Sequence, residues 1–252
     1  MPQLDKKESV RMIVQDEKNF CLSVAGHSFF VHTLHEEAYF LCRKYIANEQ
    51  GEIDIYISAD DIEKERIKAN TQNIIYQDDY LETLALFRKI AEIMLEYDTF
   101  LMHGAVVAYE EKAYMFTAAS GTGKTTHIRK WLQSLDGAYV VNGDKPLIKT
   151  SNKEIMVCGT PWRGKEKLGR NCMVPLKAII LMERGDNNII KEIPFEKALS
   201  FILKQTYMPD DKEKMKKTLQ LLSRLNGEVR FYKFIFNNMK DDAFDVAYEA
   251  IV

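Results

Sequence analysis

The 252-residue sequence lacks long apolar runs, a strong charge of either sign, and closely spaced cysteines. Its longest apolar stretches, such as residues 178–182, are far shorter than the roughly 20 residues of a membrane-spanning helix. Lys and Arg number 35 against 37 Asp and Glu, so the formal net charge is −2. This balance favours neither a nucleic-acid partner nor a membrane surface. Residues 1–8 are already charged, unlike a signal peptide.

None of the four cysteines belongs to a C-x-x-C pair, so the pattern favours neither a zinc site nor a redox motif. The sequence has no internal repeat and no low-complexity linker. We therefore expect a cytoplasmic protein with reduced thiols. A chain of this length can bury one core, or one core with a small added domain.

The densest signal is AASGTGKTT at residues 118–126, which follows an apolar run and precedes a helix-like segment. Strand, glycine-rich loop, Gly-Lys-Thr and helix are the context of a phosphate-binding loop. Glycines let backbone N–H groups surround phosphate oxygens, and the helix N-terminus adds partial positive charge. We therefore expect a bound nucleoside triphosphate. Its contacts would come from Ser120, Gly121, Thr122, Gly123, Lys124, Thr125 and Thr126.

Within this loop, Lys124 can reach the β- and γ-phosphates, and Thr125 can hold Mg²⁺ through its hydroxyl. The usual motif begins with glycine where this chain has Ala118. Alanine can make the same turn if its φ stays negative. The alternative is a glycine-rich turn that binds nothing, but such a turn has no need of this spacing.

The pattern along the chain predicts an α/β fold with an N-terminal α/β layer, residues 1–98, and a nucleotide-binding part, residues 99–252. The N-terminal layer would recognise a partner or bury a face of a homo-oligomer. Its predicted elements are a hairpin over 20–31, a helix over 36–47, a strand over 53–57, and a helix over 80–97 capped by Asp78 and Asp79. The predicted elements of the second part are strands at 100–108, 113–117, 138–141, 176–182 and 229–236, a hairpin over 146–157, and helices at 127–135, 194–208, 211–225 and from 241.

Asp144 is the candidate metal ligand, because it follows an apolar strand that would place it beside the phosphates. The alternative is an ordinary turn aspartate, since Asn-Gly-Asp favours turns. Lys145 either neutralises the transferring charge or begins the next hairpin. A lone histidine such as His103 is more often structural than catalytic. The other histidines, His27, His32, His35 and His127, are expected to be structural.

A second dense signal is the loop at 160–171, which combines two glycines with Arg163, Lys165, Lys167 and Arg170. Such a loop suits contact with phosphate or with an acidic acceptor. The alternative is a solvated surface loop, in which Trp162 packs or stacks. The charge run at 212–217 is expected to be a solvated helix face.

These segments together resemble the superfamily of HPr kinase/phosphorylase and ATP-dependent phosphoenolpyruvate carboxykinase. Residues 120–126 are similar to the carboxykinase loop, and Met102-His103-Gly104 resembles the His-Gly of HPr kinases. Gly143-Asp144-Lys145 lies where those families carry Gly-Asp-Asp or Asp-Asp. The resemblance covers roughly residues 99–185, and more faintly the C-terminal helices. It implies a P-loop fold with a mixed sheet and flanking helices.

Residues 116–127, 141–146 and 159–162 also look like a group of small HPr-kinase-like proteins. Some of these relatives phosphorylate a serine hydroxyl, including kinases of lasso peptides. The resemblance therefore implies an ATP-dependent kinase that acts on a hydroxyl, of a serine in a peptide or protein or of a small molecule.

The resemblance also implies roles for individual residues. Thr125 and Asp144 would hold Mg²⁺, or Mn²⁺ in its place, and Lys124 would stabilise the β/γ charge. Asp144 or His103 would take the hydroxyl proton. The clamp on the phosphoryl group or the acceptor would come from Arg163, Lys165 or Arg170.

The chain departs from the family pattern in two places. Lys145 replaces the second aspartate, which argues against reversible phosphorylase chemistry. The glycine-rich signature of HPr kinases is missing where the Trp162 loop lies, so HPr is not the expected substrate. Two alternatives remain: a carboxykinase-like decarboxylating phosphotransfer, and a regulatory module that binds ATP without an acceptor.

Overall fold

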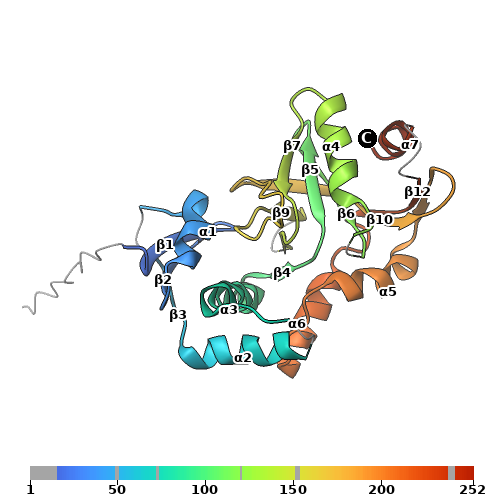
Figure 1. The fold of residues 1–252 in the computed structure, drawn as a ribbon. Coiled ribbons are helices and arrows are strands. Elements are labelled where there is room, and N and C mark those ends of the chain that lie inside the picture. Colours follow the sequence, from blue (N-terminus) through green and yellow to red (C-terminus); the bar gives the residue numbers. More distant parts are fainter. Residues whose placement is uncertain (1–15, 49–50, 72–73, 120, 151–153, 238–241) are drawn as a thin grey trace, which may run out of the picture.

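The computed structural model describes residues 16–48, 51–71, 74–119, 121–150, 154–237 and 242–252 (Figure 1). The strands are β1 (Asn19–Val24), β2 (His27–His32), β3 (Ile53–Tyr56), β4 (Thr99–Leu101), β5 (Ala105–Tyr109), β6 (Lys112–Thr117), β7 (Tyr139–Asn142), β8 (Leu147–Lys149), β9 (Met156–Cys158), β10 (Met173–Arg184), β11 (Ile189–Ile193) and β12 (Arg230–Phe236). The helices are α1 (Glu37–Cys42), α2 (Ala59–Asn70), α3 (Asp78–Ile93), α4 (Lys124–Ser134), α5 (Phe195–Gln205), α6 (Lys212–Ser223) and α7 (Ala243–Ile251), with 3₁₀ turns η1 (Arg43–Tyr45) and η2 (Met94–Tyr97).

Two sheets form within the described residues. The smaller has three strands in the order β1-β2-β3. The larger has nine and runs β4-β8-β9-β10-β6-β5-β7, with β12 beside β10 and β11 beside β12. The long strand β10 is parallel to β6 and β12 but antiparallel to β9. The large sheet is therefore mixed, as the resemblance implies.

Helices cover both faces of the large sheet (Figure 1). Successive residues of a strand point to opposite faces. Val106 and Ile179 therefore join the core beneath α5 and α6. Val107 and Ile180 join the core beneath α4 and α7. Each such fully buried aliphatic side chain contributes roughly 1.5–3 kcal/mol of transfer free energy, so the two cores hold the sheet rigid beneath the loops at its edge.

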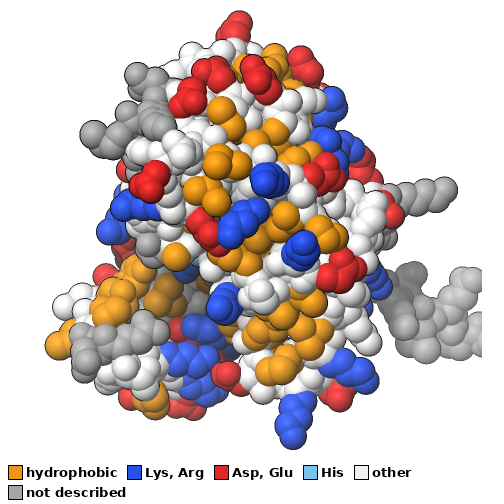
Figure 2. All heavy atoms as spheres, turned by 90° about the vertical axis from the view of Figure 1, so that its right-hand side faces the viewer, with side chains coloured by type: hydrophobic (Ala, Val, Ile, Leu, Met, Phe, Trp, Pro, Cys, Tyr) orange, Lys and Arg blue, Asp and Glu red, His pale blue; other side chains and the backbone are white. Residues whose placement is uncertain are grey.

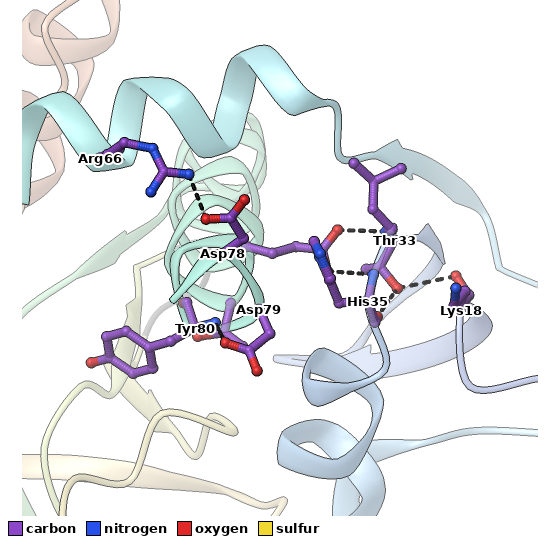
Figure 3. Close-up of polar contacts among 10 residues, drawn as sticks. Lys18, Thr33, His35, Arg66, Asp78, Asp79 and Tyr80 are labelled. Carbon is purple, nitrogen blue, oxygen red and sulfur yellow. Dashed lines mark hydrogen bonds and ion pairs between the residues drawn. The ribbon is translucent and has the colours of Figure 1, made fainter. Parts of the chain in front are cut away.

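The smaller sheet packs against α3. Its first two strands form the predicted hairpin, whose two-residue turn has positive φ at Ala25 and Gly26, the backbone of a type I′ turn. The carboxylate of Glu82, on α3, is fully buried and accepts from the N–H groups of Leu34 and His35 at 2.6 and 2.9 Å. Figure 3 shows this segment after β2 lying against the start of α3.

The start of α3 differs from the prediction. Gln77 occupies the N-cap position, and no side chain caps the helix. Asp78 instead pairs with Arg66 of α2, and Asp79 accepts from the N–H of Tyr80 (Figure 3). The expected Asp78–Asp79 cap is therefore wrong, because a neighbouring helix supplies a charged partner for the first carboxylate.

Other boundaries also differ. The strand expected over 100–108 is divided at Met102–Gly104, and its halves pair with different strands, β4 with β8 and β5 with β6 and β7. Helix α1 ends at Cys42, earlier than expected, and continues as η1. Helix α2 and strand β11 were not predicted from the sequence. The two strands of the hairpin over 146–157 pair as predicted, and its turn at 151–153 lies outside the described residues.

The surface shows mixed charge. Figure 2 views the side on which α5, α7 and β12 lie in Figure 1, and basic, acidic and hydrophobic side chains alternate across it. None of the helices in the described ranges is long and apolar enough to cross a bilayer. None of the four cysteines, all of which lie in the described part of the chain, forms a disulfide.

Candidate functional site

Three chain segments meet at one edge of the large sheet. Strand β6 ends there at Thr117, just before the glycine-rich loop. Because β5 is antiparallel to both neighbours, its first residues lie beside the ends of β6 and β7, with Ala105 opposite Phe116 and Val106 opposite Asn142. His103 before β5, the loop after β6 and Asp144 after β7 are therefore brought together, as the sequence analysis expects.

The glycine-rich loop turns through two glycines with positive φ, 77° at Gly121 and 122° at Gly123. Residues with side chains rarely adopt such angles. Thr122 closes the turn, because its hydroxyl donates to Ala119 O at 2.7 Å. Ala118 is fully buried and keeps a negative φ, so alanine fits where the usual motif has glycine. Ser120 lies outside the described residues.

Lys124 is the first residue of α4 and is largely buried. Its ammonium group donates to Ala118 O at 3.0 Å, across the mouth of the loop. Burial lowers the pKa of Lys124, and the charge of Asp144 acts in the opposite direction. The first N–H groups of a helix have no partner within the helix, and the helix end carries partial positive charge. Together with the Lys124 ammonium, the start of α4 therefore attracts an anion.

Arg184, at the end of β10, holds the same loop from outside. Its guanidinium donates to Gly121 O at 2.7 Å and to Thr122 O at 3.0 Å. These bonds tie the loop to the end of β10. Arg184 was not among the predicted site residues, because it lies about 60 positions after the loop and no motif marks it.

Asp144 and His103 form a pair. His103 Nε2 lies 3.0 Å from Asp144 Oδ1, and the other ring nitrogen, Nδ1, lies 3.0 Å from Gln205 Oε1. The backbone fixes the ring as well, because His103 N–H donates to Gln205 O at 2.7 Å. Gln205 is the last residue of α5, and the sequence analysis did not identify it as a site residue.

The turn that carries Asp144 is shaped by Asn142, which is fully buried. Its Oδ1 accepts from the N–H groups of both Asp144 and Lys145, each at 2.8 Å. Its amide nitrogen donates to Thr160 O and Oγ1, and the Thr160 hydroxyl donates to Lys145 O. The side chain of Asn142 thus forms an Asx-type turn in the protein interior, because it bonds the backbone two and three residues later. Through Thr160 it also links Asp144 to the loop at 160–171.

The surroundings of Asp144 favour its charged form. Burial alone would raise the pKa of this carboxyl, but the hydrogen bond and charge of His103, with the ammonium groups of Lys145 and Lys124, hold it below its usual value. Asp144 is therefore a carboxylate near neutral pH. It can hold a divalent cation or accept a hydrogen bond from a hydroxyl group.

A cavity of about 490 Å³ joins these elements. This volume lies within the usual range for sites that bind small ligands. Its lining comes from the glycine-rich loop, α4, the β7 turn and the cationic loop, with His103 at one side. The lining residues of most interest are His103, Gly121, Thr122, Gly123, Lys124, Thr125, Asp144, Arg163 and Lys165. Thr126 is exposed and is not part of this lining.

The cationic side chains of the loop at 160–171 lie in different environments. Lys165 is exposed and lines the cavity. Arg163 also lines it but is buried, and its guanidinium donates to the carbonyls of Pro161 and Lys167 within its own loop. Arg170 stacks on the Tyr139 ring, 4.4 Å from its centroid, and does not line the cavity. Of these candidates, Lys165 is the one that both lines the cavity and is exposed.

Packing holds the second loop against the rest of the protein. Trp162 is buried, stacks on Phe87 at 4.4 Å between ring centroids, and donates to Thr83 O. Glu166 pairs with Arg129 of α4. Loop 160–171 is thus anchored at one point to α3 and at another to the helix that follows the glycine-rich loop.

His127 is structural, as expected. It is buried in α4, its Nε2 accepts from Trp131 Nε1 at 3.0 Å, and burial lowers its pKa to about 3.

No protein-family model matches the chain, and no curated protein matches it. Thirty-three chains of solved structures do match. One is the Hpr(Ser) kinase/phosphatase from Coxiella burnetii, with 10% sequence identity over 60% of this chain and 89% of that chain, at a TM-score of 0.37. A similarity this weak assigns no function, so the function is inferred from the residues around the cavity.

Proposed function

We propose that this chain is an ATP-dependent kinase that transfers the γ-phosphate to a hydroxyl group, on a serine of a peptide or protein or on a small molecule. The main support for the proposal is that the glycine-rich loop with Lys124 and the Asp144–His103 pair line one and the same cavity. The loop with Lys124 suits a triphosphate, and the Asp144–His103 pair suits the acceptor of its terminal phosphoryl group.

In the proposed reaction, the acceptor oxygen forms a bond with the γ-phosphorus as the bond from that phosphorus to the β-phosphate oxygen breaks. ADP leaves with the electron pair of the broken bond, and the hydroxyl proton passes to the Asp144–His103 pair. Lys124 and the backbone N–H groups at the start of α4 stabilise charge on the β- and γ-phosphates, and Lys165 adds charge from the second loop. The contribution of the protein is mainly position and electrostatics.

The chain also offers ligands for a divalent cation. The Thr125 hydroxyl and the Asp144 carboxylate both line the cavity. No group of three or more His, Cys, Asp or Glu side chains suited to a metal occurs among the described residues. Oxygen donors from one hydroxyl and one carboxylate fit Mg²⁺, which usually completes its shell with water and substrate phosphates. Mg²⁺, or Mn²⁺ in its place, would neutralise phosphate charge there.

The test is transfer of label from γ-labelled ATP with Mg²⁺ into a cell extract divided by molecular size. The wild type is compared with Asp144→Asn and with Asp136→Asn, a matched change at an exposed turn outside the cavity. We expect label in one fraction with the wild type and with Asp136→Asn. The Asp144→Asn variant should label it on the order of a hundredfold more slowly, and a chelator should abolish transfer.

Equal labelling by all three proteins would contradict the assignment of Asp144. Absence of label with ATP still bound would contradict the kinase and favour a regulatory nucleotide-binding module. Label that appears in phosphoenolpyruvate, and only when oxaloacetate is added, would favour the carboxykinase-like alternative.

A further inference from the structure

A second cavity adjoins the first. It has a volume of about 240 Å³ and shares His103 with the larger cavity. Lys145 lines the second cavity, and its chain neighbour Asp144 lines the first. The Asp144–His103 pair therefore lies at the junction of the two. Besides His103 and Lys145, the second cavity is lined by Leu84, Phe87, Arg88, Leu101, Lys204, Gln205, Thr206 and Tyr207.

Cations line this second cavity from three elements. Arg88 of α3 is already neutralised, because its guanidinium makes two bonds to the Glu65 carboxylate. Lys145 and Lys204 are different, since in the described part of the chain no carboxylate lies within ion-pair distance of either. Lys145 Nζ lies instead over the Phe87 ring, 5.1 Å from its centroid. Among the described residues, the cavity thus has two ammonium groups without a directly paired carboxylate, although the charge of Asp144 acts on Lys145 from the neighbouring cavity.

One side of the cavity is apolar and firmly held. Leu84 and Phe87 come from successive turns of α3, and Leu101 comes from the end of β4. Phe87 is fixed from behind by its stacking on Trp162. Tyr207 is fixed through its hydroxyl, which donates to Glu92 at 2.9 Å. The apolar side is therefore formed before any ligand binds.

We propose that the second cavity binds the phosphoryl acceptor, and that the acceptor is a hydroxyl compound carrying an anionic group beside a small apolar group. The inference rests on the proposed kinase function. The hydroxyl lies at the His103 junction, where its proton can pass to the Asp144–His103 pair. The anionic group pairs with Lys145 and Lys204, and the apolar group packs on Leu84, Phe87 and Leu101.

The dimensions limit the acceptor further. The second cavity has about half the volume of the first, and lies below the usual range for drug-sized ligands. It accommodates a small hydroxy acid, or one residue of a longer chain, but not a folded surface. A free metabolite and a residue of a peptide can both present a hydroxyl, an anionic group and an apolar group to this cavity. The size of the labelled molecule distinguishes the two.

The first test measures acceptor kinetics. The extract is divided by anion exchange, and each pool is divided by size before incubation with γ-labelled ATP. We expect label from the anion-exchange-retained pool, in the small-molecule fraction for a metabolite or in the larger fraction for a peptide. Lys145→Met and Lys204→Met should each raise the acceptor KM roughly tenfold or more, the loss expected for one charged hydrogen bond, and leave the KM for ATP unchanged.

Lys204 is exposed, so its replacement disturbs no buried contact and remains informative if Lys145→Met folds poorly. Lys44→Met, at an exposed lysine of η1 outside both cavities, is the matched control and should leave both KM values unchanged. Two results would overturn the inference without contradicting the kinase function. One is acceptor activity in the unretained pool, and the other is an acceptor KM that neither Lys145→Met nor Lys204→Met changes.

The second test needs no transfer reaction. Isotope-labelled protein is titrated with 3-hydroxy-4-phenylbutanoate and, separately, with its neutral primary amide, and amide shifts are followed at Gln205, Thr206 and Tyr207. We expect the acid to bind roughly tenfold or more tightly than the amide, with the difference lost in Lys145→Met. Equal binding of acid and amide, or no shift with the acid up to its solubility, would overturn the inference. Selective acid binding without phosphoryl transfer would support the anion site and contradict the kinase.

Discussion

His103 Nε2 lies 3.0 Å from Asp144 Oδ1, and the opposite ring nitrogen lies 3.0 Å from Gln205 Oε1. Both ring nitrogens therefore face oxygen atoms, so contacts on either side fix the orientation of the imidazole. In the proposed reaction, His103 acts through Asp144, as a positioning residue.

Double-variant kinetics test this relationship. Asp144→Asn should lower kcat on the order of a hundredfold, and His103→Ala should lower it by about tenfold, since a base that is less well held loses part of its contribution. If His103 acts through Asp144, the double variant should be little slower than Asp144→Asn alone. Fully multiplicative losses would show that the two residues act independently.

Asn142 is expected to be the main support of the site. Asn142→Ala removes the acceptor of two part-buried N–H groups, and unsatisfied buried groups cost about 1–3 kcal/mol each. We expect the free energy of unfolding to fall by about 3 kcal/mol, with a loss of activity at temperatures where the protein remains folded. Denaturant unfolding measures the first quantity. Asn171→Ala, an exposed asparagine with one bond to Ser23 O, is the matched control and should change stability by less than about 0.5 kcal/mol.

Arg184 should affect nucleotide affinity rather than stability. Arg184→Met removes two bonds to loop carbonyls. Because the side chain is exposed, the loss should be about 1 kcal/mol, or roughly fivefold in the Kd for ATP. Calorimetric titration measures the change against Arg43→Met, an exposed arginine of η1 outside the cavity. Unchanged affinity in Arg184→Met would show that the loop keeps its shape without this contact.

The junction between η2 and α6 should be sensitive to acid. Asp98 bonds Lys217 and Arg224, which hold its pKa below the ordinary 3.8. A lowered folded-state pKa means that the stabilisation is present above 3.8 and is lost as the pH falls through the folded value. Asp98→Asn tolerates the left-handed backbone there, at φ 53°, but removes the charge.

We therefore expect the melting temperature of the wild type to be higher than that of Asp98→Asn at neutral pH. The difference between the two melting temperatures should disappear as the pH falls below 3.8. Thermal unfolding across this pH range measures both temperatures. Asp54→Asn, on the exposed side of β3, should show no such convergence. A difference in melting temperature that persists unchanged in acid would contradict the stabilising role of the Asp98 ion pairs.

The sequence was most informative where local pattern and structure coincide. The glycine-rich loop is marked by spacing that few other structures require, and Asp144 by its place after an apolar strand. The boundary at Met102–Gly104 was missed, because the apolar residues on both sides of His103 and Gly104 resemble one continuous strand. Helix α2 was missed because few of its residues are buried, although the Ser58–Asp61 capping box marks its start.

The supporting residues could not be predicted for a different reason. Gln205 and Arg184 reach the site from elements about 60 to 100 positions away in the chain, and ordinary glutamines and arginines carry no local signal. Arg163 and Arg170 look alike in the cationic loop, yet one folds back onto its own carbonyls and the other stacks on Tyr139. Only tertiary packing separates them from Lys165. The division of the chain at residue 98 stays a prediction.

A calorimetric titration of ATP with Mg²⁺ into wild type, Lys124→Met and Lys112→Met tests the nucleotide site most directly. Lys112 is an exposed lysine at the opposite end of β6, so its replacement controls for loss of a positive charge. We expect one bound nucleotide in the wild type and in Lys112→Met, with affinity on the order of a hundredfold weaker in Lys124→Met. Equal affinity in all three proteins, or no binding to the wild type, would contradict the assignment of the cavity as a nucleoside triphosphate site.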